Sequence, residues 1–320
     1  MTRRILVTGG AGFIGSRIVD LLLMRGFAVV VLDNESTGSR TNLNDGAEFI
    51  SGDVRNLNDL TPIFAAGVDA VLHIAGQASI RLSFNDPTAD LNVNTLGTIN
   101  IIQQCITHQV SRLLFASSMT IYGNPTLVPT PETALPDPVS YYAITKYAAE
   151  RYVHVTAQRR DLGFDFNVTS FRMFNVYGAG QSLTNAYQGV FAIFIGNVLR
   201  GEPIRIHSDG EQSRDFVHVS DVARAWVDAI VNSASYGQVI NLGTGTPTSV
   251  NQLCDLVLQS FGHTRASYPV EYHPAQPGDV RVSAANIDRA RTLLGWSPQI
   301  TTQTGMPDTI AWARESVANK

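Results

Sequence analysis

Two side chains that could exchange a proton, Tyr142 and Lys146, lie four residues apart in the chain. On a helix, this spacing places both side chains on one face. A phenol is a poor base at neutral pH because its reference pKa is about 10, but a nearby ammonium group stabilises the phenolate and lowers that pKa. We therefore predict that both residues are catalytic. The same spacing arises by chance in many helices, so the pair alone is a weak signal, and Tyr141 is one residue out of register with the lysine.

Ser118 is the third candidate catalytic residue. It follows Ser117 and the apolar run of residues 113–116, which is typical of a buried strand. The carboxyl ends of parallel strands are where such sheets build their sites. A serine at this position can hydrogen-bond a reacting oxygen and relay its proton, whereas Ser117 could simply satisfy backbone groups at the strand end. We predict that Ser118 contacts the substrate.

A glycine-rich segment near the start of the chain predicts a dinucleotide site. Residues 10–15 fit the pattern G-x-G-x-x-G, and they follow an apolar run at residues 4–8 and precede an amphipathic helix pattern. Glycine permits a tight turn and a close approach of the backbone to a pyrophosphate, and the helix N-terminus presents unpaired N–H groups to that anion. The predicted cofactor contacts here are Gly9, Gly12, Phe13, Ile14 and Gly15.

Asp33 indicates which dinucleotide is bound. It ends the second apolar run, 18 residues after Gly15. A carboxylate at this position can accept hydrogen bonds from both adenosine ribose hydroxyls and would repel a 2′-phosphate, so we predict NAD. Asn34, beside it, is a further predicted contact. Asp53 follows the third run, and two interpretations are open: it reaches the adenine amino group, with Val54 beside it, or it caps the next helix.

The fourth apolar run ends in small residues, which suit a backbone segment that passes near a cofactor. We therefore add Ala75 and Gln77 to the predicted cofactor contacts. His73, just before them, is interpreted as structural rather than catalytic. Lys146 can also hold the nicotinamide ribose, so Tyr142 and Lys146 count as cofactor contacts as well.

Composition excludes several classes of protein. The chain has 320 residues, 44% apolar and 16% charged, which is typical of a soluble globular protein. With 23 Lys plus Arg against 27 Asp plus Glu, the formal net charge of −4 argues against a nucleic-acid partner. No stretch reaches the about 20 apolar residues of a membrane span, and the first apolar run is too short for a secretory signal, so we expect a cytoplasmic protein. Cys105 and Cys254 are expected to be buried free thiols, and no metal site is predicted.

The order of the apolar runs predicts an α/β fold: a Rossmann-type doubly wound parallel sheet with a smaller mixed C-terminal substrate lobe. Strands are expected at residues 4–8, 28–32, 47–51, 69–74, 112–117 and 166–172, and helices at 13–25, 56–65, 89–107 and 138–160. A further helix and strand at about 220–242 should return to the sheet. We therefore divide the chain into a cofactor-binding domain, 1–172 plus about 220–242, and a substrate-binding lobe, 173–219 plus 243–320.

Several motifs together resemble one family. They are Thr8–Gly15, Ser117–Gly123, Tyr142–Lys146, Arg172–Gly178, Asp209–Val219 and Pro277–Arg281. Over nearly its whole length the chain resembles the extended short-chain dehydrogenase/reductase family, and within it the NAD-dependent nucleotide-sugar epimerases and dehydratases. The resemblance implies NAD as the cofactor and a nucleotide sugar, UDP-linked, as the substrate. It also implies a homodimer through helices near 89–107 and 138–160, whose apolar faces could equally be internal core.

The resemblance further implies roles for single residues. Asn94 matches an asparagine that supports the active-site backbone, and we count it among the cofactor contacts. Asn175 matches a contact to the substrate diphosphate or sugar. Arg214 and Arg281 match arginines that clamp the diphosphate, which suits the fork geometry of a guanidinium. Ser283 lies where some galactose-type epimerases carry a bulky aromatic residue, so it would leave room for a 2-acetamido group.

The residues after Ser118 distinguish members of the family. Dehydratases carry an Asp–Glu pair there, and decarboxylases usually carry Glu at the second position, whereas this chain has Met119 and Thr120. Thr120 matches the 4-epimerases, but Met119 replaces their usual small residue. The resemblance thus implies inversion at C4 of a UDP-sugar through a transient 4-keto sugar, with Tyr142 as the base. UDP-glucose/UDP-galactose and the N-acetylated pair are both open, and a reductase, a decarboxylase or a non-catalytic NAD-binding regulator are the alternatives.

Overall fold

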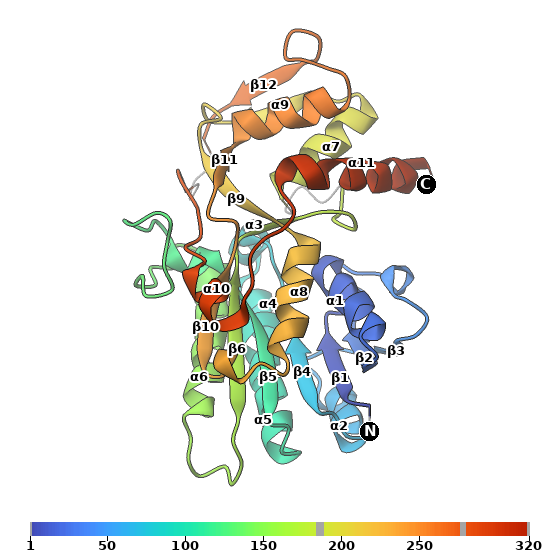
Figure 1. Ribbon diagram of the computed structural model, residues 1–320, viewed down its shortest axis with the longest axis vertical. Helices are drawn as coiled ribbons and strands as arrows, with labels where there is room; N and C mark the ends of the chain where they lie inside the picture. Colours follow the sequence, from blue (N-terminus) through green and yellow to red (C-terminus); the bar gives the residue numbers. More distant parts are fainter. Residues whose placement is uncertain (1, 184–188, 276–279, 319–320) are drawn as a thin grey trace.

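The large lobe is built on a seven-stranded parallel sheet (Figure 1). The computed structural model describes residues 2–183, 189–275 and 280–318. The strand order is β10-β6-β5-β4-β1-β2-β3. The strands are β1 (Arg4–Thr8), β2 (Ala28–Asp33), β3 (Glu48–Ser51), β4 (Ala70–His73), β5 (Arg112–Ser118), β6 (Asn167–Met173) and β10 (Gln238–Leu242). The predicted Rossmann-type sheet, with its returning last strand, is confirmed.

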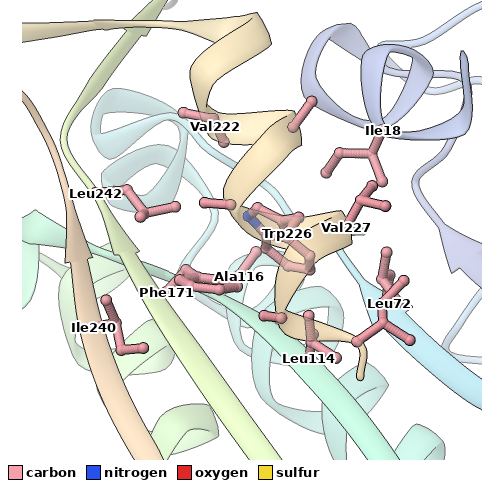
Figure 2. Packing of buried hydrophobic residues seen from close by; sticks show 14 of the residues in the cluster. Ile18, Leu72, Leu114, Ala116, Phe171, Val222, Trp226, Val227, Ile240 and Leu242 are labelled. Carbon is pink, nitrogen blue, oxygen red and sulfur yellow. The ribbon is translucent and has the colours of Figure 1, made fainter. Parts of the chain in front are cut away.

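Both faces of this sheet are covered, which explains why its strands are apolar at successive positions. Side chains point alternately to the two faces of a strand. Ile5 and Val7 of β1 lie in one apolar cluster with α1 (Phe13–Met24) and α8 (Val219–Ala229). Leu6, between them, lies in a second cluster with α2 (Leu57–Ala65) and α5 (Gly97–Thr107). Figure 2 shows the first cluster, in which Trp226 of α8 packs among side chains of the sheet.

The helix that carries the Tyr–Lys pair is α6 (Tyr141–Ala157), on the same side of the sheet as α5. Its N-cap is Ser140, whose hydroxyl oxygen accepts a hydrogen bond from the Ala143 N–H. Such a cap satisfies a donor that the helix cannot pair internally. The helix therefore begins three residues later than the predicted start at 138 and places Tyr142 in its first turn.

The helix predicted over 89–107 is confirmed, but it begins two residues earlier and contains a π turn. The chain forms α3 (Ile80–Asn85), which the sequence pattern does not predict, then α4 (Pro87–Leu91), a wider π turn (Asn92–Leu96) and α5. Helix α4 begins at Pro87 because Asp86 accepts a hydrogen bond from the Ala89 N–H and proline suits the first helical turn. The π turn carries Asn94, whose side chain binds backbone of a neighbouring loop.

The smaller lobe lies beyond the carboxyl ends of the sheet strands (Figure 1). It is mixed, as predicted. Its strands are β7 (Asn175–Tyr177), β8 (Ile204–His207), β9 (Ser213–His218), β11 (Pro247–Ser249) and β12 (Val270–His273), and its helices are α7 (Val190–Arg200), α9 (Val250–Ser260) and α11 (Thr302–Ala318). Strand β9 pairs antiparallel with β11 and parallel with β7, and β8 pairs parallel with β12. A third apolar cluster holds these elements together.

Two later segments return to the large sheet. Helix α8 packs on α1, and β10 pairs with β6. Helix α10 (Asp288–Leu294) also packs on this side, since Ile287, Ala290 and Trp296 lie in the first apolar cluster. The predicted division of the chain into two domains, which assigns residues 243–320 to the smaller lobe, stays a proposal.

Two further expectations concern the cysteines and the absence of a membrane-spanning segment. Cys105 in α5 and Cys254 in α9 are buried free thiols, as predicted. None of the helices within the described ranges is long and apolar enough to cross a bilayer.

Candidate active site

Three hydroxyl-bearing side chains meet at the carboxyl end of β5. Ser118 is the last residue of that strand, and its hydroxyl oxygen accepts hydrogen bonds from the Thr120 N–H at 3.2 Å and from the Thr120 hydroxyl at 2.9 Å. The Tyr142 phenol, from the first turn of α6, hydrogen-bonds the Ser118 side chain. The structure therefore brings Ser118 and Tyr142 together, and both side chains are buried.

Lys146 lies one helical turn after Tyr142 and is also buried. Its Nζ stands 4.5 Å from the centroid of the Phe115 ring, which is a cation–π geometry. Burial lowers the pKa of Lys146 to about 8, and the negative charges of Asp90 and Glu150 oppose that fall. The lysine is therefore still mostly protonated at neutral pH.

The pKa of Tyr142 differs from the sequence-based expectation. Burial raises it above its ordinary value, the hydrogen bond with Ser118 opposes the rise, and the negative charge of Asp90 adds to it. Desolvation of the phenolate is the largest effect, so the pKa of Tyr142 is raised although the lysine lies one turn away. The expectation that the Lys146 ammonium stabilises the phenolate stays a prediction.

The glycine-rich loop between β1 and α1 is packed so closely that side chains would not fit at two of its positions. A Cβ on Gly9 would lie 2.7 Å from the Ala75 nitrogen, and one on Gly15 would lie 2.1 Å from the Gly9 carbonyl oxygen. Gly9 also has a φ of 70°, which favours glycine. Gly12 is less crowded, since a Cβ there would meet only the Gly9 carbonyl oxygen, at 3.3 Å.

The N-terminus of α1 adjoins this loop. Its N-cap is Gly12, which has no side chain to accept hydrogen bonds from the first-turn N–H groups, and that turn contains no acidic residue. The N–H groups of Phe13 and Ile14 are thus among the unpaired donors of a helix start, which suit an anion. The loop and the helix start together fit the pyrophosphate of a dinucleotide.

Asp33 lies at the end of β2 beside the same loop. Its two carboxylate oxygens accept hydrogen bonds from the Ala11 N–H at 3.0 Å and from the Glu35 N–H at 2.8 Å. Burial raises the pKa of Asp33, and these two hydrogen bonds oppose the rise. Because each oxygen keeps a second lone pair, the carboxylate is fixed in place and can still accept hydrogen bonds from ribose hydroxyls.

Asp53 is held by side chains rather than by the next helix. It binds the Arg55 guanidinium at 2.7 and 2.9 Å and accepts a hydrogen bond from Asn34 Nδ2 at 2.8 Å. The hydrogen bond with Arg55 is the main reason that the pKa of Asp53 falls to about 2. The N-cap of α2 is Asn56, so helix capping by Asp53 is wrong. Contacts of Asn34, Asp53 and the buried Val54 with the cofactor stay predictions.

Asn94 fastens the loop that follows β4. Its Oδ1 accepts a hydrogen bond from the Gln77 N–H at 2.9 Å, and its Nδ2 donates to the Gln77 carbonyl oxygen at 3.1 Å. A Cβ on Gly76 would lie 2.9 Å from Asn94 Oδ1 and 3.6 Å from Lys146 Nζ. Asn94 thereby holds the backbone of residues 75–77 beside the lysine, which is the geometry that a supporting role requires.

The predicted substrate contacts lie along the smaller lobe. Asn175 begins β7, and its buried side-chain oxygen has no hydrogen-bond partner within the described part of the chain. A buried acceptor of this kind costs free energy unless a ligand pairs with it. Arg214 of β9 donates to the Val280 carbonyl oxygen at 2.6 Å, and Arg281 forms an exposed ion pair with Asp209 at 2.7 Å. Residues 277–279 of the last family motif lie outside the described residues.

Ser283 faces Met119 across a small cavity. Its hydroxyl donates to the Met119 sulfur at 3.3 Å. The cavity between them has a volume of about 10 Å³, and its other lining residues are Tyr122, Gly123, Pro125, Thr130, Phe174 and Val280. Met119, which departs from the family pattern, thus contacts Ser283. Ser283 is the residue that we expected to leave room for an acetamido group.

A buried ion pair stands behind the site. Arg172 donates to both carboxylate oxygens of Glu150, from Nη2 at 2.6 Å and from Nε at 3.0 Å. Ser117 donates to Glu150 at 2.6 Å, so it has a structural role. His73 is structural as well, because both of its ring nitrogens hydrogen-bond threonine hydroxyls and burial lowers its pKa to about 3.

Two residues of the site are missed by sequence reasoning. Asp90 is a buried carboxylate that hydrogen-bonds Asn94. Its position four residues before Asn94 in a helical segment was the available signal. Gly38 lies against the glycine-rich loop, since a Cβ there would lie 2.6 Å from the Ala11 carbonyl oxygen.

Known proteins resemble the chain over its whole length. Residues 5–243 match the NAD dependent epimerase/dehydratase family. The UDP-glucose 4-epimerase of Mycolicibacterium smegmatis is 37% identical over 318 residues, which cover 97% of this chain and 98% of that protein. The structure of UDP-glucose 4-epimerase from Thermotoga maritima with UDP-glucose is 38% identical with a TM-score of 0.92, and covers 98% of this chain and 99% of that one. The Thermus thermophilus UDP-glucose 4-epimerase in complex with NAD is 35% identical with a TM-score of 0.88, and covers 97% and 99%.

These similarities agree with the geometry of the site. The glycine-rich loop and the uncapped start of α1 fit a dinucleotide, and NAD is the cofactor that the family name and the Thermus structure carry. The family resemblance inferred from the motifs is confirmed. With NAD as its cofactor and nucleotide sugars as its class of substrate, this chain belongs to the NAD-dependent epimerase/dehydratase family.

Proposed function

We propose that this protein interconverts the C4 epimers of a UDP-sugar, with UDP-glucose and UDP-galactose as the first candidate pair. The observation that carries the proposal is the identity of the groups around Ser118. The phenol beside Ser118 is that of Tyr142, and the two residues after Ser118 are Met119 and Thr120, neither of which can remove water or protonate a carbanion. This set of groups suits an oxidation that is then reversed.

In the proposed mechanism, the chain supplies binding and proton transfer. Tyr142 takes the proton of the C4 hydroxyl, directly or through Ser118, and later returns it. Lys146 keeps positive charge close to the phenol. NAD, when bound, supplies the acceptor for the two electrons that leave C4 and return to it. The residues that would hold it are the glycine-rich loop, the start of α1, Asp33 and the loop that Asn94 fastens.

In this proposal Asn175, Arg214 and Arg281 bind the substrate. The unpaired oxygen of Asn175 would pair with a hydroxyl of the substrate, and Arg214 and Arg281 would bind the diphosphate oxygens. Because the two arginines hold the diphosphate rather than the sugar ring, the sugar can pivot about its diphosphate link and turn over within the site, which an inversion at C4 requires. Holding the reacting groups in this way supplies much of the rate.

The experiment is a turnover assay on the purified protein with UDP-galactose and UDP-glucose. Proton NMR of the sugar should show either substrate converting to the other, and absorbance of NADH should show no net change. Net formation or consumption of NADH would instead indicate a reductase or a decarboxylase. Absence of turnover with a full panel of UDP-sugars would favour a non-catalytic NAD-binding protein.

The second candidate pair of substrates is UDP-N-acetylglucosamine and UDP-N-acetylgalactosamine. We propose that Met119 disfavours this pair. Ser283 is small, but the Met119 side chain contacts it and leaves a cavity of about 10 Å³. In this proposal the Met119 side chain occupies the space beside Ser283 that an acetamido group would need. The protein should therefore prefer the sugars with a 2-hydroxyl.

Met119→Ala should widen that preference. Removal of the side chain opens space beside Ser283, so the ratio of kcat/KM for UDP-N-acetylgalactosamine to that for UDP-galactose should rise roughly tenfold or more. Met24→Ala, at an exposed methionine of α1, is the matched control and should leave the ratio unchanged. An unchanged ratio in Met119→Ala would show that Met119 does not determine the preference between 2-hydroxyl and 2-acetamido sugars.

We also propose that the protein works in the cytoplasm. We further propose that two copies of the chain form a dimer through the face made by α4, the π turn and α6. Six large apolar side chains on these elements are 43–51% exposed: Leu91, Leu96, Tyr141, Ile144, Tyr152 and Val155. Those of α6 lie on one face, since they are spaced by 3, 8 and 3 residues. Their exposure argues against the alternative that they belong to the internal core, and a contiguous apolar face suits a partner surface.

Charge on this face should separate the two copies. In the double variant Ile144→Glu and Val155→Glu, light scattering should give the mass of a single chain, 34.7 kDa, whereas the unsubstituted protein should give twice that mass. Leu135→Glu, at an exposed leucine of a loop, controls for added charge and should stay dimeric. A monomeric unsubstituted protein would refute the dimer.

A further inference from the structure

Asp90 is a buried carboxylate outside the residues so far given a role in the reaction. It lies on α4, and only 1% of its surface is exposed. Three donors from three segments bind it: the Thr145 hydroxyl at 2.6 Å on Oδ2, and Gln77 Nε2 at 2.8 Å and Asn94 Nδ2 at 3.1 Å on Oδ1. A buried charge is tolerated when it is hydrogen-bonded, and both oxygens of this carboxylate accept hydrogen bonds.

The three donors belong to the three segments that surround Lys146. Gln77 lies in the loop after β4, Asn94 in the π turn, and Thr145 immediately before Lys146 on α6. Asn94 also binds the Gln77 backbone through both of its side-chain groups. Thr95, next to it, donates to the Thr145 carbonyl oxygen at 3.0 Å. The carboxylate of Asp90 is thus the common acceptor of one network.

Charge links Asp90 to the proposed reaction. The Asp90 carboxylate raises the pKa of Lys146, and the lysine lowers the pKa of Asp90 in return, although burial of each group works in the opposite direction. The other charged or titratable groups that face Lys146 are His73 of β4 and Glu150 of α6. His73 is neutral at neutral pH, and Glu150 already pairs with Arg172.

The Asp90 carboxylate also raises the pKa of the Tyr142 phenol. An Asp90 charge therefore favours a protonated lysine and a protonated phenol in the resting site. Of the two negative charges that act on Lys146, only that of Asp90 also holds the loop and the π turn beside it.

We propose that Asp90 is a positioning residue that ties the loop after β4, the π turn and α6 into one unit and supplies the buried negative charge that balances the Lys146 ammonium. The inference rests on the proposed function, since it takes Tyr142 and Lys146 as the reacting pair. Asp90 itself does not touch the reacting atoms; it acts through Thr145, Asn94 and the charge of the lysine.

Two substitutions separate the two parts of this role. Asp90→Asn removes the charge and keeps the shape of the side chain. Thr145→Val removes one hydrogen bond to Asp90 and keeps the charge. Without the charge, the pKa of Lys146 falls further, so less of the lysine is protonated at alkaline pH and the alkaline limb of the kcat profile moves to lower pH. We expect Asp90→Asn to lower kcat roughly tenfold or more at pH 8.5, and by less at pH 6.5.

Thr145→Val should act differently. It should lower kcat by a similar factor at every pH, leave KM nearly unchanged and leave the alkaline limb in place, because positioning is lost without loss of charge. Thr145→Ser, which keeps the hydroxyl, should restore activity. If Asp90→Asn fails to fold, this pair of variants still tests the network: wild-type kcat in Thr145→Val would overturn the positioning role.

A direct readout does not depend on turnover. The titration of Lys146, followed by NMR in protein with ¹³C-labelled lysine, should have a lower midpoint in Asp90→Asn than in the unsubstituted protein, and the same midpoint in Thr145→Val. An unchanged midpoint in Asp90→Asn would overturn the charge-balancing role even if the protein proves to be an epimerase. A lowered midpoint would support it even if the UDP-sugar assays find no turnover, so the two proposals fail separately.

Discussion

Tyr142→Phe should lower the turnover of UDP-sugars by roughly 10²- to 10⁴-fold and leave NAD bound. The substitution removes the phenol that, in the proposed mechanism, finally takes the C4 proton and later returns it. Phenylalanine fills the same space, and the start of α6 does not depend on the phenol because Ser140 caps it. Burial raises the pKa of this phenol, so it is protonated in the resting site.

The measurements are kcat from sugar NMR and the amount of NAD released when the variant is denatured. Tyr141→Phe is the matched control: Tyr141 is its neighbour on α6, is exposed, and packs its ring against Phe84 at 5.2 Å. It should keep full activity. Full activity in Tyr142→Phe would refute the role of the phenol, and loss of NAD together with activity would mean that the residue binds the cofactor rather than moves a proton.

Glu150→Ala should destabilise the protein by about 3–5 kcal/mol, which is the usual cost of breaking a buried ion pair. Arg172 and Glu150 are both nearly inaccessible to solvent, and the pair is doubly hydrogen-bonded. Removal of the carboxylate leaves the guanidinium in the interior with the Tyr122 hydroxyl at 3.0 Å and a backbone carbonyl as its remaining partners. Ser117 loses its acceptor at the same time.

Thermal unfolding should report the loss as a decrease of Tm on the order of 10 °C. Asp161→Ala is the control, because it removes an ion pair with Arg159 that water already screens, and its Tm should not change measurably. If Glu150→Ala unfolds at the same temperature as the unsubstituted protein, the network of Glu150 and Arg172 does not stabilise the fold.

The sheet and its cofactor loop were predictable because their signals are local. Strand β1 reads as a continuous apolar run since Ile5 and Leu6 face opposite, covered sides of the sheet. Gly9 and Gly15 occur where no Cβ would fit. In the same way, Tyr142 and Lys146 lie one turn apart on a helix, so their spacing in the sequence already fixes their relation in space.

The details of the helices near the site were less predictable. The apolar pattern of residues 89–107 does not reveal the π turn, because a single wide turn leaves the spacing of apolar residues almost unchanged. Likewise, Asp53 stands three residues before Asn56, and only the structure distinguishes which of them caps α2.

What the sequence determined by itself is the doubly wound α/β architecture, the use of NAD, and the identity of the residues proposed to react. What only the tertiary structure decided is their environment: the raised pKa of Tyr142, the contact between Met119 and Ser283, and the network around Asp90. These properties depend on burial and on contacts between segments far apart in the chain. Desolvation and hydrogen bonding act over a few ångströms in space, so no spacing along the sequence records them.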